Sequence, residues 1–306
     1  MMGDGVLRGH IRILITTLSL SIFVTAHAGN LPVSNVATSF SKSFDTTLQR
    51  KLASVLEQMG LSRAAINGKL AVALVDITNP DAPKVAAING DEMMYAASLP
   101  KIAILYAAFV EINRGRLRLD KQTRESLTRM IRVSSNEDAT LMLNRIGKQR
   151  VLEILQTGPF RFYDPATNGG LWVGKEYAKG TAYRRDPLHN ISHGATVLQT
   201  ARLYFLLESG RLLPPDLTAQ MKEMLGHPAI NHKFVKGLSK RPEAVVYRKS
   251  GTWRQWHADS ALVEANGYKY VAVVLAEDPQ GGQWLERLIT PMHDLIVHPK
   301  YAAVTD

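Results

Sequence analysis

The apolar positions of this 306-residue chain form strand-like runs near both ends and helical patterns between them. Residues 69–76 and 84–88 are apolar runs separated by a turn with two prolines, which predicts a pair of adjacent strands. Residues 244–277 predict three more strands, and residues 283–297 follow the spacing of an amphipathic helix. Between about residues 92 and 240 the pattern is almost entirely helical, with one Gly-rich interruption.

The order of these elements predicts an α+β fold. Residues 47–58 add a helix ahead of the first strand. We expect the first and last parts of the chain, about residues 29–91 and 241–306, to share one antiparallel β-sheet flanked by helices. The helical middle, about residues 92–240, would be an inserted all-α subdomain, and a cleft would lie between the two parts.

Residues 1–28 have the pattern of a secretory signal peptide. Two arginines precede the apolar stretch 13–24, and Ala-His-Ala follows at residues 26–28. The apolar stretch is shorter than the roughly 20 residues that a transmembrane helix needs, and no later segment reaches that length. We expect a single catalytic domain over residues 29–306, exported to the periplasm or the extracellular space without stable membrane insertion.

Composition narrows the range of partners. The formal net charge is +10, but the basic residues are scattered without interleaved aromatic residues, so nucleic acid is not an expected partner. The chain has no cysteine, so its stability would depend on the hydrophobic core and not on disulfides. His227, His232 and His257 lack the spacing of metal ligands, so we expect no metal and no cofactor. A monomer is the default expectation.

Three short motifs supply the groups needed for acyl transfer: SLPK at residues 98–101, SSN at residues 134–136 and KSG at residues 249–251. If Ser98 opens a helix, the amine of Lys101 lies one turn later on the same face, within reach of the Ser98 hydroxyl. Burial and a second cation would lower the pKa of Lys101, so that its neutral amine could act as a base.

The context of each motif fits this interpretation. Residues 102–114 are apolar nearly all round, which predicts a buried helix that holds its first turn rigidly. Ser134 falls in a turn between two helical patterns, where its side chain can point into a cleft. Lys249 ends the alternating run of residues 244–247, and Gly251 follows where a backbone in close contact with a ligand needs glycine.

On these motifs the chain resembles the penicillin-recognising serine enzymes, and most closely class A β-lactamases, from about residue 67 to about residue 297. The resemblance implies that Ser98 is the acylated nucleophile, Lys101 its base and Ser134 the hydroxyl that relays a proton to the departing nitrogen. It also implies an oxyanion hole made by the backbone N–H groups of Ser98 and Thr252.

The same resemblance implies a substrate-binding set. Asn136 would hold the acylamino side chain of the substrate, and Lys249 with Ser250 would bind its carboxylate. The full set comprises Asn136, Lys249, Ser250, Gly251 and Thr252.

The chain departs from class A at the step in which water releases the acyl group. The Glu-x-x-x-Asn loop whose carboxylate activates water in class A does not occur between Asn136 and a helix predicted near Ser192. By count Glu176 is the best placed substitute, with Asp164 and Asp186 behind it. A solvent-exposed loop acid is an equal alternative for Glu176, and pairing with a neighbouring arginine is the favoured alternative for Asp186.

Two further departures concern the shape of the cleft. Only 36 residues separate Ser98 from Ser134, fewer than is typical of class A, which predicts a shortened wall and a more open site. The second motif is also Ser-Ser-Asn, not the commoner Ser-Asp-Asn. Trp253, Trp256 and His257 follow the third motif and either line the cleft or pack as an ordinary turn and strand.

Three functions remain open at this point. The first is a β-lactamase, in which Ser98 opens the lactam and water hydrolyses the acyl-enzyme. The second is a D-alanyl-D-alanine peptidase or a related serine hydrolase that acts on peptidoglycan peptides. The third is a penicillin-binding sensor that is acylated without turnover. We favour the first, because a free, exported, single-domain chain suits a soluble hydrolase best.

Overall fold

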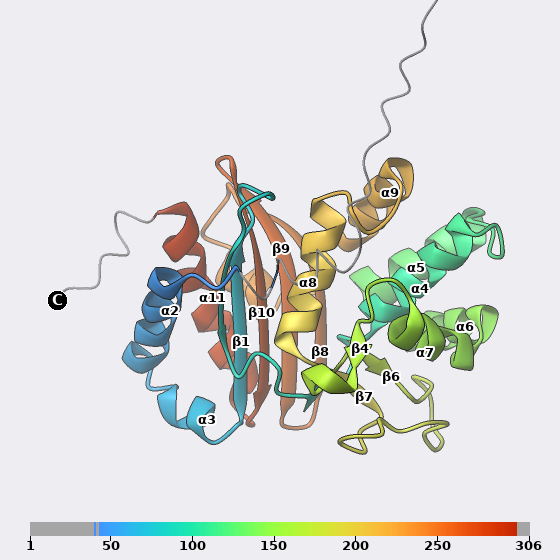
Figure 1. The fold of residues 1–306 in the computed structure, drawn as a ribbon, viewed down its shortest axis with the longest axis horizontal. Coiled ribbons are helices and arrows are strands. Elements are labelled where there is room, and N and C mark those ends of the chain that lie inside the picture. The colour runs from blue at the N-terminus through green and yellow to red at the C-terminus, as the bar shows by residue number, and fades with distance from the viewer. Residues whose placement is uncertain (1–39, 41–42, 299–306) are drawn as a thin grey trace, which may run out of the picture. The chain divides into compact units, whose positions relative to one another are not determined.

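The structure is a computed structural model that describes Phe40 and residues 43–298 (Figure 1). The signal peptide predicted at residues 1–28 lies outside the described residues. No helix among residues 43–298 is both long and apolar enough to cross a membrane.

Both ends of the described chain contribute to one five-stranded antiparallel sheet with the strand order β2-β1-β10-β9-β8. Strand β1 pairs with β10, so that Leu70 lies opposite Ala276, and this pairing joins the N-terminal strands to the C-terminal ones. The predicted α+β architecture is confirmed. The strands are β1 (Leu70–Asp76), β2 (Lys84–Ile88), β8 (Val245–Trp253), β9 (Trp256–Ala265) and β10 (Tyr268–Glu277).

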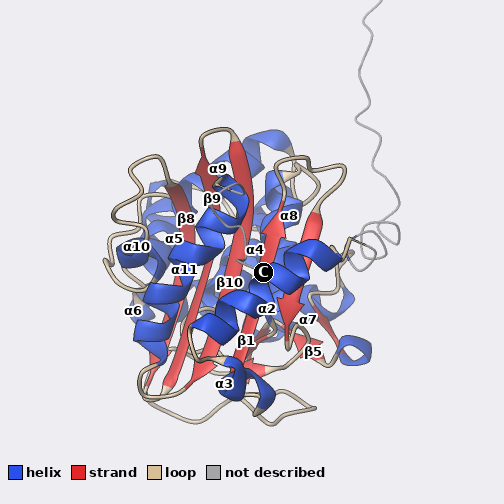
Figure 2. Cartoon of the chain, turned by 90° about the vertical axis from the view of Figure 1, so that its left-hand side faces the viewer, coloured by secondary structure: helices blue, strands red, loops and turns tan. Residues whose placement is uncertain are grey.

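Helices cover both faces of this sheet (Figures 1 and 2). The period-two alternation of β1 separates two cores, because Leu70, Val72 and Leu74 pack with α2 and α11, whereas Ala71 and Ala73 pack with the helical middle of the chain. The helices are α2 (Thr46–Gln58), α3 (Ser62–Ile66), α4 (Lys101–Asn113), α5 (Lys121–Arg132), α6 (Asn136–Ile146), α7 (Lys148–Thr157), α8 (Val197–Glu208), α9 (Pro215–Leu225), α10 (Phe234–Gly237) and α11 (Gly281–Val297).

Helix α4 is the buried helix that the sequence predicts. It runs over Lys101–Asn113, and ten of its 13 residues are buried, among them Phe109 in the middle of the helix. Its neighbours α6, α7 and α9 surround it. A helix packed on all sides holds its first turn in place, and that turn carries the SLPK motif.

The prediction of an almost wholly helical middle is wrong in one region. Short strands occur there, and the helix predicted near Ser192 begins only at Val197, capped by Thr196. Ladders of two or three residues are too short to show a hydrophobic period, so the sequence does not reveal them. They are β3 (Met94–Tyr95), β6 (Trp172–Val173) and β7 (His193–Ala195) in one sheet, and β4 (Tyr163–Asp164) with β5 (Gly169–Gly170), bridged by a 3-10 turn at Pro165–Thr167.

Candidate active site

Ser98 lies in a tight turn just ahead of α4. The helix begins at Lys101, whose backbone N–H donates to the Ser98 carbonyl at 3.2 Å, so the serine and the lysine are the two ends of one turn. Ala97 before them has a φ of +51°, a left-handed conformation that is uncommon for any residue but glycine and that occurs often at functional sites. The turn therefore presents Ser98 in a fixed position beside the pocket that it lines.

Strand β8 runs against this turn at Gly251. A Cβ atom at Gly251 would lie 2.2 Å from the Ala96 carbonyl oxygen and 2.8 Å from the Ser98 nitrogen. The glycine is therefore required by close contact between two segments of the chain, and not by contact with a ligand as we expected. The same contact brings Thr252 to the pocket that Ser98 lines. The two residues implied for the oxyanion hole thus lie beside one cavity.

The amine of Lys101 is buried and bound to the second motif. Its Nζ donates to the Ser134 carbonyl oxygen at 2.6 Å and to Asn136 Oδ1 at 2.7 Å, and it lies 3.3 Å from Ser134 Oγ. Ser134 has a φ of +57°, a left-handed backbone that accompanies this contact. We expected a hydrogen bond from Lys101 to Ser98. None is found among residues 43–298, and the amine faces the SSN motif in this structure.

Lys249 approaches the same hydroxyl from the opposite side. Its Nζ donates to Ser134 Oγ at 3.0 Å and to the Ser250 carbonyl oxygen at 2.6 Å. Lys249 does not end its strand, as the sequence suggested, because β8 continues to Trp253 and Lys249 lies at its centre. The alternation of apolar and polar residues ends after residue 247, because the next three residues are polar and yet their side chains are buried.

Ser134 therefore joins two buried amines. Lys101 and Lys249 are 0% and 1% exposed. If Lys249 donates to Ser134 Oγ, the hydroxyl proton is free to point at Lys101, whose neutral amine has one lone pair to accept it. The arrangement is a short path along which a proton can move between two nitrogen atoms and an oxygen atom.

Burial lowers the pKa values of both amines. It lowers the pKa of Lys101 from 10.5 to about 7. It also lowers the pKa of Lys249, and the charges of Lys101 and Arg248 lower it further. Because the charged form of an amine loses hydration when it is buried, a neutral Lys101 is accessible near neutral pH, as a base requires.

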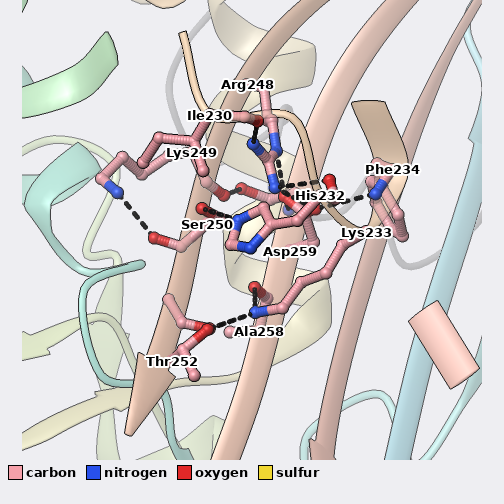
Figure 3. A network of polar contacts seen from close by, with 12 residues as sticks. Ile230, His232, Lys233, Phe234, Arg248, Lys249, Ser250, Thr252, Ala258 and Asp259 are labelled. Atoms are coloured by element: carbon pink, nitrogen blue, oxygen red, sulfur yellow. Dashed lines mark hydrogen bonds and ion pairs between the residues drawn. The ribbon is translucent and has the colours of Figure 1, made fainter. Parts of the chain in front are cut away.

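A buried ion pair supports the centre of β8 (Figure 3). Arg248 donates to both carboxylate oxygens of Asp259, at 2.8 and 2.7 Å, and to the backbone carbonyls of Ile230 and His232. The carboxylate also accepts from the Phe234 N–H at 3.1 Å. With these partners the pair is well satisfied, and removing one member of such a pair costs about 3–5 kcal/mol.

This network holds two further side chains beneath the third motif, neither of which the sequence singled out as part of the site. His232 Nε2 lies 3.2 Å from Ser250 Oγ. Lys233 Nζ donates to the Gly251 carbonyl oxygen at 2.5 Å and to Thr252 Oγ1 at 2.8 Å (Figure 3). Burial lowers the pKa of His232 to about 4 and that of Lys233 to about 8. The region behind Ser250 and Thr252 is thus rich in nitrogen donors.

The loop that follows β6 forms an aromatic wall over Lys101. The Lys101 amine lies 4.5 Å from the centre of the Tyr177 ring, and this ring stacks on His193 at 4.3 Å with planes 9° apart. The Tyr177 hydroxyl donates to the Ala97 carbonyl oxygen at 3.4 Å. His193 is buried, its Nδ1 has no hydrogen-bond partner among the described residues, and its pKa is lowered to about 3 by burial and by Lys175 and Lys101. Both rings of this wall are therefore uncharged near neutral pH.

None of the three acids considered from the sequence occupies a dry, unpaired position. Glu176 lies on the pocket rim, 30% exposed, and its carboxylate pairs with Lys148 at 2.5 Å. That hydrogen bond holds the pKa of Glu176 below its usual value. Its surroundings fit the loop-acid alternative better than they fit a general base, for which a raised pKa is expected.

The other two acids serve the loop itself. Asp164 accepts from the Ala166 N–H at 3.0 Å and so caps a 3-10 turn. Asp186 is buried and accepts from the Tyr163 hydroxyl and from the His189 N–H. We favoured an arginine partner for Asp186, and the structure pairs it with a tyrosine because the arginine side chains beside it point elsewhere.

The aromatic residues after the third motif divide between two roles. Trp253 and Trp256 face each other across the β8–β9 hairpin and line the pocket. His257 points away from it, against Gly281 and Gly282 at the start of α11. The hairpin tip at Arg254 completes this side of the pocket.

The pocket in front of Ser98 has a volume of about 1040 Å³. This is slightly above the usual range for small-molecule sites, about 300–1,000 Å³. Four cationic side chains and one paired acid, Glu176, border it. The cations are Lys175, Lys179, Arg185 and Arg254.

Solved structures share this fold. A β-lactamase from Sphaerobacter thermophilus DSM 20745 aligns with 86% of this chain and 97% of its own, at 15% identity and a TM-score of 0.60. PBP-A aligns with 80% of this chain and 95% of its own, at 18% identity and a TM-score of 0.57. A class A β-lactamase described as the last common ancestor of Gram-negative bacteria aligns with 80% of this chain and 98% of its own, at 20% identity and a TM-score of 0.60. No curated protein sequence matches the chain.

Fold and comparisons together place the protein in the superfamily of β-lactamase-like serine hydrolases. The sequence matches the family described as "Beta-lactamase enzyme family" over residues 47–125 and 122–297, which is most of the chain. The protein belongs to this family, and the resemblance to class A β-lactamases and their relatives is confirmed.

Proposed function

We propose that this protein is a serine hydrolase that opens the β-lactam ring through an acyl-enzyme on Ser98. The observation that carries the proposal is the pair of buried amines of Lys101 and Lys249, joined by Ser134 Oγ directly behind the pocket that Ser98 lines. The turn that carries Ser98 also supplies free backbone N–H groups ahead of α4, which favour an oxyanion.

The proposed reaction begins when Ser98 Oγ attacks the lactam carbonyl. Neutral Lys101 takes the hydroxyl proton, the carbon–nitrogen bond of the ring breaks, and the proton reaches the departing nitrogen through Ser134 Oγ. Lys249 attracts the substrate carboxylate. A water molecule then attacks the ester carbonyl and regenerates Ser98. We assign this second step to Lys101 as well, because its lowered pKa of about 7 suits a base, whereas the pKa of Glu176 is held below its usual value.

A second candidate function is cleavage of acidic peptides of the cell wall as a D-alanyl-D-alanine peptidase. The observation that favours it is the cationic border of a pocket that is large for a small-molecule site. Kinetics on an acyl-D-alanyl-D-alanine peptide with and without an additional carboxylate distinguish the two. A preference for the dianionic peptide over penicillin, measured as kcat/KM and reduced by salt, supports the peptidase.

The proposed function is tested with a chromogenic cephalosporin. We expect multiple turnovers by the wild-type protein and a loss of at least about 10³-fold with Ser98→Ala, since the nucleophile is gone. Ser209→Ala, at the partly exposed C-terminal end of α8, is the matched control. Turnover that survives Ser98→Ala would contradict an acyl-enzyme on this residue, and a single stoichiometric burst would favour the sensor.

We also propose that the protein acts outside the cytoplasm after removal of residues 1–28. The support is the sequence pattern of this segment, with its arginines, its apolar stretch and its small residues. N-terminal sequencing of the protein from cell fractions tests the proposal. A mature chain that begins at Gly29 is the expected result, and an uncleaved chain in the cytoplasm would contradict it.

A further inference from the structure

Two imidazoles and one carboxylate meet at the end of α11, away from the acyl-transfer site. They belong to Glu243, ahead of β8, to His293 in the last turns of the helix, and to His298 just after it. One donor atom from each lies within 4.8 Å of the other two. Figure 2 shows α11 crossing the outer face of the sheet in front of β8 and β10.

The distances in this cluster are long for hydrogen bonds. Glu243 Oε1 lies 3.4 Å from His293 Nε2 and 3.9 Å from His298 Nε2. Hydrogen bonds of this type are usually about 2.7–3.2 Å long. Ligand atoms at about 2.0–2.2 Å from a tetrahedral zinc ion lie roughly 3.3–3.6 Å apart. The separation of Glu243 and His293 falls in this range, and that of Glu243 and His298 is 0.3 Å longer.

His293 also has the surroundings of a metal ligand. Its side chain is fully buried, and its Nδ1 lies 3.0 Å from the hydroxyl of Tyr270, which is buried as well. A ligating histidine usually has its second nitrogen held by a hydrogen bond, which fixes the ring and directs the other nitrogen at the ion. Here that contact directs Nε2 at Glu243.

Glu243 is the acid that faces the two imidazoles, because the other nearby acid, Asp294, is paired with an arginine. Arg241 and Asp294, on either side of the cluster, bind each other at 2.7 and 2.8 Å. Their charges cancel locally. Glu243 and His298 are partly exposed, so an ion can enter from solvent.

We propose that Glu243, His293 and His298 bind one divalent transition-metal ion, with zinc the best match to a donor set of two imidazoles and one carboxylate. The fourth position would hold water. The ion links the chain after α11 to the segment that enters β8, the strand that carries Lys249. It stabilises the fold of a chain without disulfides and takes no part in acyl transfer, so the inference is independent of the proposed function.

Zinc titration of the full chain tests this inference. After treatment with a chelator, the untagged protein is titrated with zinc chloride in competition with a chromophoric chelator. We expect His298→Ala and Glu243→Gln each to weaken the zinc affinity at this site at least about tenfold. Zinc should raise the Tm of the wild-type protein and raise that of the two variants less at the same zinc concentration. Both substituted side chains are partly exposed, and circular dichroism checks that the variants fold.

His227→Asn is the matched control, because His227 is exposed, lies outside the cluster and has a φ of +52°, which asparagine tolerates. It should bind zinc as the wild type does. Absence of zinc binding in the wild type, or equal binding by the wild type and both cluster variants, would overturn the proposal. With cobalt in place of zinc, the strong visible absorption of a tetrahedral site should appear in the wild type and be lost in His298→Ala.

Discussion

The two walls of the pocket differ in how the sequence encodes them. One wall is the turn that carries Ser98, and the buried side chains of Lys101, Ser134 and Lys249 pack behind it around α4 and β8. The other wall is the loop that carries Tyr177, and ladders of two or three residues hold it in place. The first wall supplies the groups that can attack and transfer protons. The second determines what lies opposite them, and here it places an aromatic ring over Lys101.

This difference shows which parts of the reaction are fixed by the scaffold and which by the loop. Acyl transfer to Ser98 depends on side chains held by helix and strand packing. Release of the acyl group depends on what the loop brings to the site. Substitutions on one wall at a time therefore separate the two steps.

Replacement of the buried amine is expected to have the largest effect on the motif wall. Lys101→Met should slow acylation of Ser98 by about 10²–10⁴-fold, the usual contribution of a general base. Single-turnover acylation by benzylpenicillin measures it. Lys236→Met, which removes an exposed lysine paired with Glu286, is the control. Acylation within about threefold of the wild type would exclude Lys101 as the base.

The pH dependence of acylation tests the state of the same amine. Only the neutral form accepts the proton, and the neutral fraction grows as pH rises through the lowered pKa of about 7. The rate should therefore increase about tenfold per pH unit below this value and level off above it. An acylation rate that keeps rising toward the ordinary lysine pKa of 10.5 would show that burial does not tune Lys101.

A change in the loop wall should move that pH profile. The Tyr177 ring stabilises the ammonium form of Lys101 by about 0.5–2 kcal/mol. Tyr177→Leu removes this effect but keeps an apolar cover, so the pKa of Lys101 should fall by about 0.4–1.5 units. The acylation profile then shifts to lower pH. Tyr177→Phe retains the ring and should leave the profile in place. The same midpoint in both variants would exclude an electrostatic role for the ring.

The smallest effect is expected at the acid that the sequence favoured. Glu176→Gln removes an exposed ion pair with Lys148, a kind of interaction worth about 0–1 kcal/mol, so turnover should change less than about twofold. Steady-state kinetics with the chromogenic cephalosporin measure it. An acyl-enzyme that accumulates in this variant would instead identify Glu176 as the base that activates water.

Much of the first wall was predictable because its spacing is local. Ser98 and Lys101 are three residues apart on one turn, and the apolar run after them shows that the turn is anchored by a buried helix. The antiparallel sheet followed from short runs of apolar residues bounded by turns, of which β1 is the clearest. The continuation of β8 past Lys249 was missed because buried polar residues there interrupt the alternation.

The second wall was not predictable from spacing. Tyr177 reaches Lys101, and His193 stacks behind it, only because β7 pairs with β3 next to the nucleophile turn. Similarly, Lys233 meets Thr252 because an ion pair between two strands, Arg248 with Asp259, holds its segment. His293 and His298 are five residues apart and become neighbours of Glu243 through the packing of α11. Contacts of this kind depend on the tertiary fold.

Acylation of Ser98 is tested by the mass of the intact protein after brief exposure to benzylpenicillin, followed by peptide mapping. We expect one added penicilloyl group, on the peptide that contains Ser98, which disappears on further incubation without penicillin. An adduct on another residue, or no adduct with either short or long exposure while penicillin is consumed, would contradict this expectation.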